Sequence, residues 1–166
     1  MRLYKVQILL NLCNDLYSST YQRPPLKFEA GTPMVAEVLG LGEAIRFIET
    51  IGRDNIAAWE KDLLEYATRR LQEIKGLRII GTAPNKGPII SFVIDDLHPL
   101  DIGTLLDIRG IAVRTGHLCA QPTLKAFNVP SMTRISFGIY NTFEEIDIVT
   151  EALKDISLLL CPSLSY

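Results

Sequence analysis

Residues 114–122 (RTGHLCAQP) bring together a thiol at Cys119, an imidazole at His117 and a guanidinium at Arg114. Positive charge near a cysteine favours the thiolate, which is the nucleophilic form of the side chain. Gly116 gives this segment the composition of a loop, and loops carry function more often than core segments do. A free cysteine is also commonly buried as a small apolar residue. The residue types therefore predict either a reactive thiol or a structural one.

Two other positions could bind an anion. Thr32 precedes a proline at the start of a helical pattern, where free N–H groups beside a hydroxyl could hold a phosphate. The same pattern is typical of a simple N-cap. Arg134 lies in the alternating stretch 133–137 (TRISF), in which Ile135 and Phe137 share the other face. An arginine in a buried strand is costly unless it meets an anion, either a protein carboxylate or an acidic ligand.

Hydrophobic periodicity predicts the elements that must position these residues. The order of elements predicts a two-layer α/β sandwich, in which a small and largely antiparallel sheet is covered by helices. Asp54 or Asn55 is the expected N-cap of the second helix, and residues 142–145 form a capping box before the last one. The predicted elements are helices at 33–51, 56–74, 99–108 and 142–156, a helical turn at 123–127, and strands at 77–80, 88–94, 111–113 and 133–137.

The composition is that of an ordinary globular domain. The chain has 166 residues, of which 48% are hydrophobic and 22% are charged. Its net charge is −2 and no basic stripe is evident, which argues against nucleic acid as a partner. The apolar run at residues 6–12 is too short to span a bilayer and has no signal-peptide cleavage pattern, so no membrane partner is expected.

The three cysteines, Cys13, Cys119 and Cys161, are odd in number and far apart in the sequence. This spacing argues against a disulfide framework and against a cysteine-rich zinc site. His98 is the only histidine besides His117, so no metal site is expected. A reducing compartment, the cytoplasm, fits this pattern best.

Three segments in this order resemble one enzyme family. The segment 114–122 is similar to the active-cysteine segment of the Suf-type (group II) cysteine desulfurases and selenocysteine lyases, which are class V, fold-type I enzymes that use pyridoxal phosphate. The segment 27–33 (KFEAGTP) resembles their Phe-Glu-x-Gly-Thr-Pro motif, and 133–145 resembles their substrate-carboxylate strand and the start of their last helix. The resemblance runs from about Tyr21 to Ile156.

The resemblance implies a role for each candidate residue. Cys119 would be the nucleophile that takes sulfur from L-cysteine and becomes a persulfide, leaving L-alanine. Arg134 would bind the substrate carboxylate, and Thr32 would help to hold the phosphate of pyridoxal phosphate in the neighbouring subunit of a homodimer. Arg114 and His117 would flank the thiol. The sulfur would pass to an acceptor protein for iron–sulfur cluster assembly.

The sequence departs from the family at two points. Met34 stands where the family has asparagine, and none of the seven lysines has the Ser-x-His-Lys setting of the Schiff-base lysine. We therefore expect residues 27–158 to be the small C-terminal domain with its linking helix, 1–26 an unassigned lead-in and 159–166 a tail. Such a fragment of a truncated or excised enzyme should be inactive alone and should expose apolar surface that favours self-association.

Two other functions are compatible with the same residues. One is a non-catalytic domain that binds a partner protein or accepts sulfur from it. The other is a selenocysteine lyase, because the thiol in the loop at Cys119 suits either substrate.

Overall fold

The computed structural model describes residues 21, 23–28, 31 and 33–160, and it divides the chain into two units, 1–51 and 52–166. In the first unit, a short 3-10 helix, η1 (Leu26–Phe28), precedes helix α2 (Val35–Ile51). The predicted helix at 33–51 is thus confirmed except at its start, which lies at Val35 and not at Pro33. The predicted phosphate seat at Thr32 lies outside the described residues.

Helix α2 exposes its apolar side chains within the first unit. None of its residues is buried, although its sequence is rich in leucine, isoleucine and valine. Isolated surface leucines are normal, whereas a continuous apolar face marks a surface that another element covers. The exposed large residues of this helix are Val35, Val38, Leu39, Leu41, Ile45, Phe47 and Ile48.

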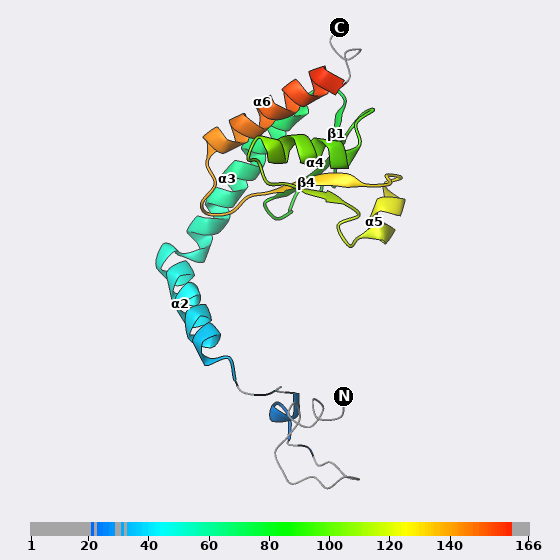
Figure 1. The fold of residues 1–166 in the computed structure, drawn as a ribbon. Helices are drawn as coiled ribbons and strands as arrows, with labels where there is room; N and C mark the ends of the chain where they lie inside the picture. Colours follow the sequence, from blue (N-terminus) through cyan, green and yellow to red (C-terminus); the bar gives the residue numbers. More distant parts are fainter. Residues whose placement is uncertain (1–20, 22, 29–30, 32, 161–166) are drawn as a thin grey trace, which may run out of the picture. The chain divides into compact units, whose positions relative to one another are not determined.

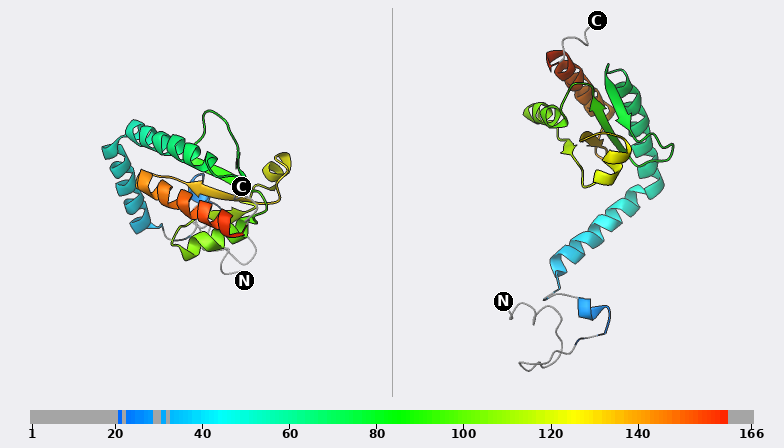
Figure 2. Two further views of the ribbon diagram at one scale, coloured as in Figure 1. Left: turned by 90° about the horizontal axis from the view of Figure 1, so that it is seen from above. Right: turned by 90° about the vertical axis from the view of Figure 1, so that its right-hand side faces the viewer.

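The second unit is a two-layer α/β sandwich, as predicted. Its four strands form one antiparallel sheet in the order β1-β2-β4-β3. Helices α3, α4 and α6 cover one face of this sheet, and the short helix α5 lies against the other face (Figures 1 and 2). The elements are α3 (Arg53–Gln72), β1 (Leu77–Ile80), β2 (Ile89–Ile94), α4 (Pro99–Ile108), β3 (Arg114–Gly116), α5 (Gln121–Ala126), β4 (Met132–Ser136) and α6 (Phe143–Leu160).

The main core lies between the helices and one face of the sheet. Strand β2 alternates in period two, so that Ile90, Phe92 and Ile94 point into this core. Helix α3 adds a stripe at spacings of three and four residues, in which Leu63 and Leu71 are fully buried. The rings of Trp59, Tyr66 and Phe143 close the core at the start of α6, with edge-to-face contacts at 5.2 and 5.1 Å between ring centroids.

Helices α3 and α6 are also joined by a polar cluster. The Tyr66 hydroxyl and the Arg70 Nε each donate a hydrogen bond of 2.8 Å to the Asp147 carboxylate. The hydrogen bonds from Tyr66 and then from Arg70 lower the pKa of Asp147, because they favour its charged form. Arg70 also contacts Glu73 and Glu151, so this cluster fixes the packing of two helices that are far apart in the sequence.

Several predicted boundaries can be compared with the structure. The capping box is confirmed: the Glu145 N–H donates to the Thr142 hydroxyl, and the Thr142 N–H donates to the Glu145 carboxylate. The hydrogen bonds from Asn141 and Thr142 lower the pKa of Glu145. The predicted cap at Asp54 or Asn55 is wrong, because α3 begins one turn earlier, after Gly52.

The predicted strand at 111–113 is also wrong. Strand β3 runs instead over Arg114–Gly116, because these are the residues that pair with β4. The first three residues of the cysteine segment therefore belong to the sheet, and the loop itself begins at His117. This shift ties the thiol to the sheet more closely than the sequence predicts.

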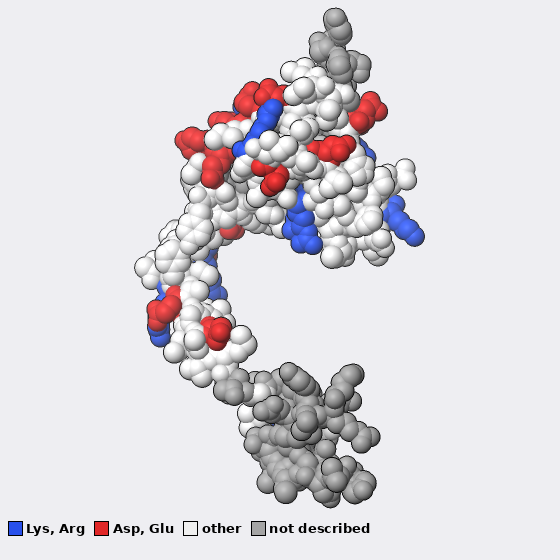
Figure 3. All heavy atoms as spheres, viewed as in Figure 1, with Lys and Arg blue, Asp and Glu red and all other residues white. Residues whose placement is uncertain are grey.

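On the face drawn in Figure 3, acidic side chains gather over the helical layer of the second unit, with basic side chains scattered among and below them. In the part of the chain that the structure describes, no helix is both long and apolar enough to cross a membrane.

Candidate active site

The thiol sits at the tip of a tight loop that follows the edge strand β3. Cys119 is exposed, and an Arg114 guanidinium nitrogen lies 3.9 Å from its sulfur. The Ala120 N–H donates to the His117 carbonyl and closes the turn. The prediction of a structural, buried cysteine is therefore wrong, and the arrangement suits a nucleophilic thiolate beside a cation.

This loop has an unusual backbone. Gly116, Leu118 and Cys119 all have positive φ angles, at 106°, 54° and 56°. Only glycine adopts such angles freely, so the two non-glycine residues together store a few kcal/mol by the usual cost of about 1–3 kcal/mol each. Strain of this kind persists only where the surroundings hold the loop in place.

A second, smaller core supplies that support. Leu118 and Ala120 pack against the buried side chains of Leu124 on α5 and Met132 on β4. The loop is thus anchored by its apolar residues on one side of the thiol, while Cys119 itself points to solvent. Such an arrangement holds a reactive group in a fixed and accessible position.

Arg134 lies on the same face of the sheet as the thiol loop. The strand register places Arg134 between Ser91 on β2 and Arg114 on β3. The Arg134 Nε is buried and has no hydrogen-bond partner in the part of the chain that the structure describes. A buried donor without an acceptor is costly, so this nitrogen is poised to bind an acceptor that the described residues do not provide.

The pairing of Arg114 with Arg134 makes this face of the sheet electropositive. Like charges directly opposite one another on a sheet are destabilising, and an anion between them removes the repulsion. Guanidinium groups bind carboxylates through two parallel hydrogen bonds. No carboxylate partner of Arg134 is found among the described residues, and its predicted acidic ligand stays a prediction.

The remaining predicted site residues contribute less to this geometry. The His117 side chain is exposed and forms no hydrogen bond or ion pair with any residue that the structure describes; only its backbone carbonyl is bonded, by the Ala120 N–H. It stays a neighbour of the thiol in sequence, with no contact that defines a role. Thr32 lies outside the described residues, so its predicted role stays a prediction. Among residues 33–160, no group of three or more histidine, cysteine, aspartate or glutamate side chains is placed to hold a metal ion.

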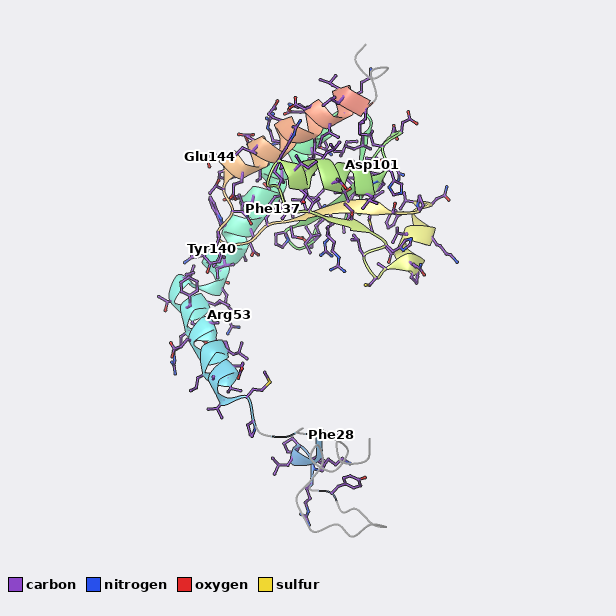
Figure 4. All side chains as sticks on the ribbon, in the orientation of Figure 1. Phe28, Arg53, Asp101, Phe137, Tyr140 and Glu144 are labelled. Atoms are coloured by element: carbon purple, nitrogen blue, oxygen red, sulfur yellow. The ribbon has the colours of Figure 1, made fainter. Side chains whose placement is uncertain are left out.

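A cavity of about 430 Å³ lies at the other end of β4, away from the thiol. It opens beside the segment that leads from β4 to α6, where Figure 4 labels Phe137, Tyr140 and Glu144. No lysine lines this cavity, and neither Cys119 nor Arg134 borders it. The lining includes Arg109, Ile111, Val113, Ser136, Asn141 and Glu145.

Two residues beside the site escaped the sequence analysis. Ser91 lies directly opposite Arg134, and only the strand register reveals this. Gly103 in α4 lies against Thr115 of β3. A glycine inside a helix is itself a signal, because it costs about 1 kcal/mol relative to alanine and usually has a packing reason.

The fold and the site define a small α/β domain that presents a thiol and two guanidinium groups on one face of its sheet. The chain matches the family Aminotransferase class-V over residues 10–149, and it belongs to that family. Residues 10–149 contain all five predicted site residues.

Several relatives of known name are similar to this chain. A "Probable cysteine desulfurase" of Mycolicibacterium paratuberculosis is 50% identical over 142 residues, which cover 86% of this chain and 21% of that protein. A "Probable cysteine desulfurase" of Streptomyces coelicolor is 50% identical over 144 residues, which cover 86% of this chain and 34% of that protein. The chain thus spans about a fifth to a third of the length of these relatives.

Solved structures agree with this assignment. The cysteine desulfurase CsdA of Escherichia coli, in an S-sulfonic acid form, matches with a TM-score of 0.81 and 30% identity over 93% of this chain and 38% of that one. The apo cysteine desulfurase of Thermococcus onnurineus matches with a TM-score of 0.79 and 32% identity over 90% of this chain and 37% of that one. The predicted resemblance to cysteine desulfurases is confirmed.

Proposed function

We propose that this chain carries the sulfur-accepting part of the active site of a pyridoxal-phosphate-dependent cysteine desulfurase. The strongest support is the buried, unpartnered Nε of Arg134 on the same sheet face as the exposed thiol of Cys119. One group suits a carboxylate and the other suits an electrophilic sulfur, and L-cysteine offers both.

In the proposed reaction, Arg134 binds the carboxylate of L-cysteine and fixes the orientation of its side chain. The Cys119 thiolate attacks the substrate sulfur, so that a new S–S bond forms as the bond between the substrate Cβ and sulfur breaks. The electron pair of the broken bond stays with Cβ, which takes up a proton to give L-alanine. Cys119 is left as a persulfide, and Arg114 stabilises the anionic sulfur before and after transfer.

The groups that activate the substrate must come from outside the described residues. Pyridoxal phosphate supplies the electron sink in this chemistry, and its lysine anchor has no counterpart in the sequence. We therefore propose that the 166-residue chain alone releases no sulfide from L-cysteine, even with added pyridoxal phosphate. In the intact enzyme, Thr32 would hold the cofactor phosphate of the neighbouring subunit in a homodimer.

The persulfide sulfur would pass to an acceptor protein and supply iron–sulfur cluster assembly. An exposed thiol of this kind persists in a reducing compartment, so we place the protein in the cytoplasm. The exposure of Cys119 also supports a second candidate function, in which the chain accepts sulfur from a partner without catalysing its release. A selenocysteine lyase would use the same two residues on the selenium analogue.

A chimera tests the main proposal. The matching segment of the Streptomyces coelicolor relative would be replaced by residues 21–160 of this chain, and alanine and persulfide would be measured after addition of L-cysteine. We expect Cys119→Ala to abolish the persulfide, and Arg134→Lys to raise the KM for L-cysteine with little change in protein stability. A chimera that keeps full sulfur transfer without Cys119 would refute the proposal.

The isolated chain separates the two candidate functions. Incubation with a small persulfide donor should load sulfur on Cys119 whether or not the chain is catalytic, and mass spectrometry would detect the added 32 Da, which is about one sulfur atom. Sulfide production from L-cysteine by the chain alone would contradict the proposed inactivity. Selenocysteine in place of L-cysteine would show which substrate the chimera prefers.

A further inference from the structure

The strand that carries Arg114 is short and lies at the edge of the sheet. Strand β3 has three residues and pairs with β4 on one side only. A strand of this length gains few ladder hydrogen bonds, so its position depends on what packs against its face. Helix α4 is the element that contacts this face.

The contact between α4 and β3 depends on Gly103, which has no side chain. A Cβ atom built on Gly103 would lie 2.6 Å from the Cγ2 of Thr115, 3.4 Å from its Oγ1 and 3.7 Å from its Cβ. Real Cβ contacts are essentially never as short as the first of these distances. Thr115 is β-branched and has little freedom at χ1, so its methyl group cannot swing away without cost.

We infer that Gly103 is a positioning residue for the Cys119 thiol, which rests on the proposed role of Cys119 as the sulfur acceptor. Because Gly103 has no side chain, β3 can pack directly on α4. This packing fixes the position of Thr115, of Arg114 just before it, and of the strained loop that follows β3. An alanine at this position would force its Cβ and the Thr115 Cγ2 apart by about 0.4–0.8 Å, the difference between 2.6 Å and the 3.0–3.4 Å range of tight contacts, and we expect β3 to take up this shift.

The thiol loop cannot absorb such a shift freely. Its two non-glycine residues with positive φ, Leu118 and Cys119, are already held in a narrow region of backbone space. A displaced β3 would therefore move Arg114 away from the sulfur, which now lies 3.9 Å from its guanidinium. Cys119 is already exposed, so the shift removes the contact with Arg114 without improving access to the thiol.

The test compares the rate of Cys119 alkylation by iodoacetamide in the full chain, measured on the Cys119 peptide by mass spectrometry. We expect Gly103→Ala to slow this reaction by about threefold or more, because the attraction between the Arg114 guanidinium and the reacting sulfur weakens as the 3.9 Å distance between them grows. The double variant Gly103→Ala/Thr115→Ser should restore the rate, because it removes the Cγ2 methyl that clashes.

Gly40 offers a matched control. It is also a helical glycine, but a Cβ built on it meets no atom within 4 Å. Gly40→Ala should therefore leave the alkylation rate unchanged and should not lower the melting temperature, because alanine has the higher helix propensity.

Each outcome bears on the inference. A folded Gly103→Ala chain with a wild-type alkylation rate overturns it, even if its stability falls, and leaves the proposed role of Cys119 untouched. If Gly103→Ala fails to fold by circular dichroism, the double variant decides: a wild-type rate supports the inference and an altered rate overturns it. A chimera that keeps full sulfur transfer without Cys119 would instead refute the proposed function.

Discussion

Arg134 should destabilise the domain that it serves, and its replacement by methionine should make the chain more stable. Its Nε is buried and lacks a hydrogen-bond partner among the described residues. Its guanidinium also faces Arg114 across the β3–β4 pair. Methionine keeps an unbranched, flexible apolar stem of similar length while removing both the donor and the charge.

The magnitude follows from these two terms. A buried donor without a partner costs about 1–3 kcal/mol, and a like-charge cross-strand pair costs about 0.2–1 kcal/mol. We expect Arg134→Met to raise the free energy of unfolding by about 1–2 kcal/mol, because some apolar surface of the methionine stays exposed. For a domain of this size, that gain corresponds to a rise in melting temperature of several degrees, at about 4 °C for each kcal/mol.

The assay is thermal unfolding followed by circular dichroism, with Arg78→Met as the matched control. Arg78 lies on the same face of the sheet, but it is exposed and has no buried unpartnered nitrogen. Its replacement should change the stability by less than about 0.5 kcal/mol. An Arg134→Met chain that melts at or below the wild-type temperature would refute the argument that this arginine is kept for a ligand.

Two further predictions concern stability and association. The pKa of Asp147 is lowered in the folded chain by Tyr66 and Arg70, so its stabilising effect is present above the unfolded pKa and is lost as the pH falls through the folded value. The melting temperature of Asp147→Asn should therefore lie below that of the wild type at pH 7, and the gap should close below about pH 4; a constant gap would contradict this. The exposed apolar residues of α2 should cause the isolated chain to self-associate, and Leu41→Glu with Ile45→Glu should reduce the apparent mass in sedimentation velocity; a monomeric wild type would count against this.

The sheet and its layers could be predicted because the signals were periodic. The alternation at residues 133–137 placed Ile135 in the core and Arg134 on the opposite face, and both placements are confirmed. The capping box predicted the start of α6, because its two hydrogen bonds join residues only three apart in the sequence. Patterns that involve near neighbours in the sequence need no tertiary information.

The edge strand could not be predicted in this way. The apolar run at 111–113 suggested a strand, but those residues line the cavity beside β4 and α6 instead. The neighbouring residues 114–116 form the strand because of their register with β4, which is a long-range contact. A run of three apolar residues is too short for periodicity to decide its structure.

The conformation of the thiol loop depends on tertiary contacts in the same way. Sequence composition marks Gly116 as a residue suited to positive φ, but nothing in it marks Leu118 or Cys119. Their conformation is supported by the small core under α5, and we infer that the contact of Gly103 with Thr115 holds the strand that precedes them. The sequence therefore predicted which residue types in the loop could react, but it did not predict the strained backbone of Leu118 and Cys119.

The two halves of the site differ in how completely the described residues build them. The thiol is fully supported, because strand, loop and small core all fix Cys119. The anion site is unfinished, because Arg134 has a buried donor and a like-charged neighbour but no acceptor in the described part of the chain. A supported nucleophile beside an unsatisfied cation is what a ligand with a carboxylate and a transferable sulfur would complete. Under the proposed function this asymmetry fits a substrate-binding role for Arg134, and the stability of the Arg134→Met chain tests that role against a structural one.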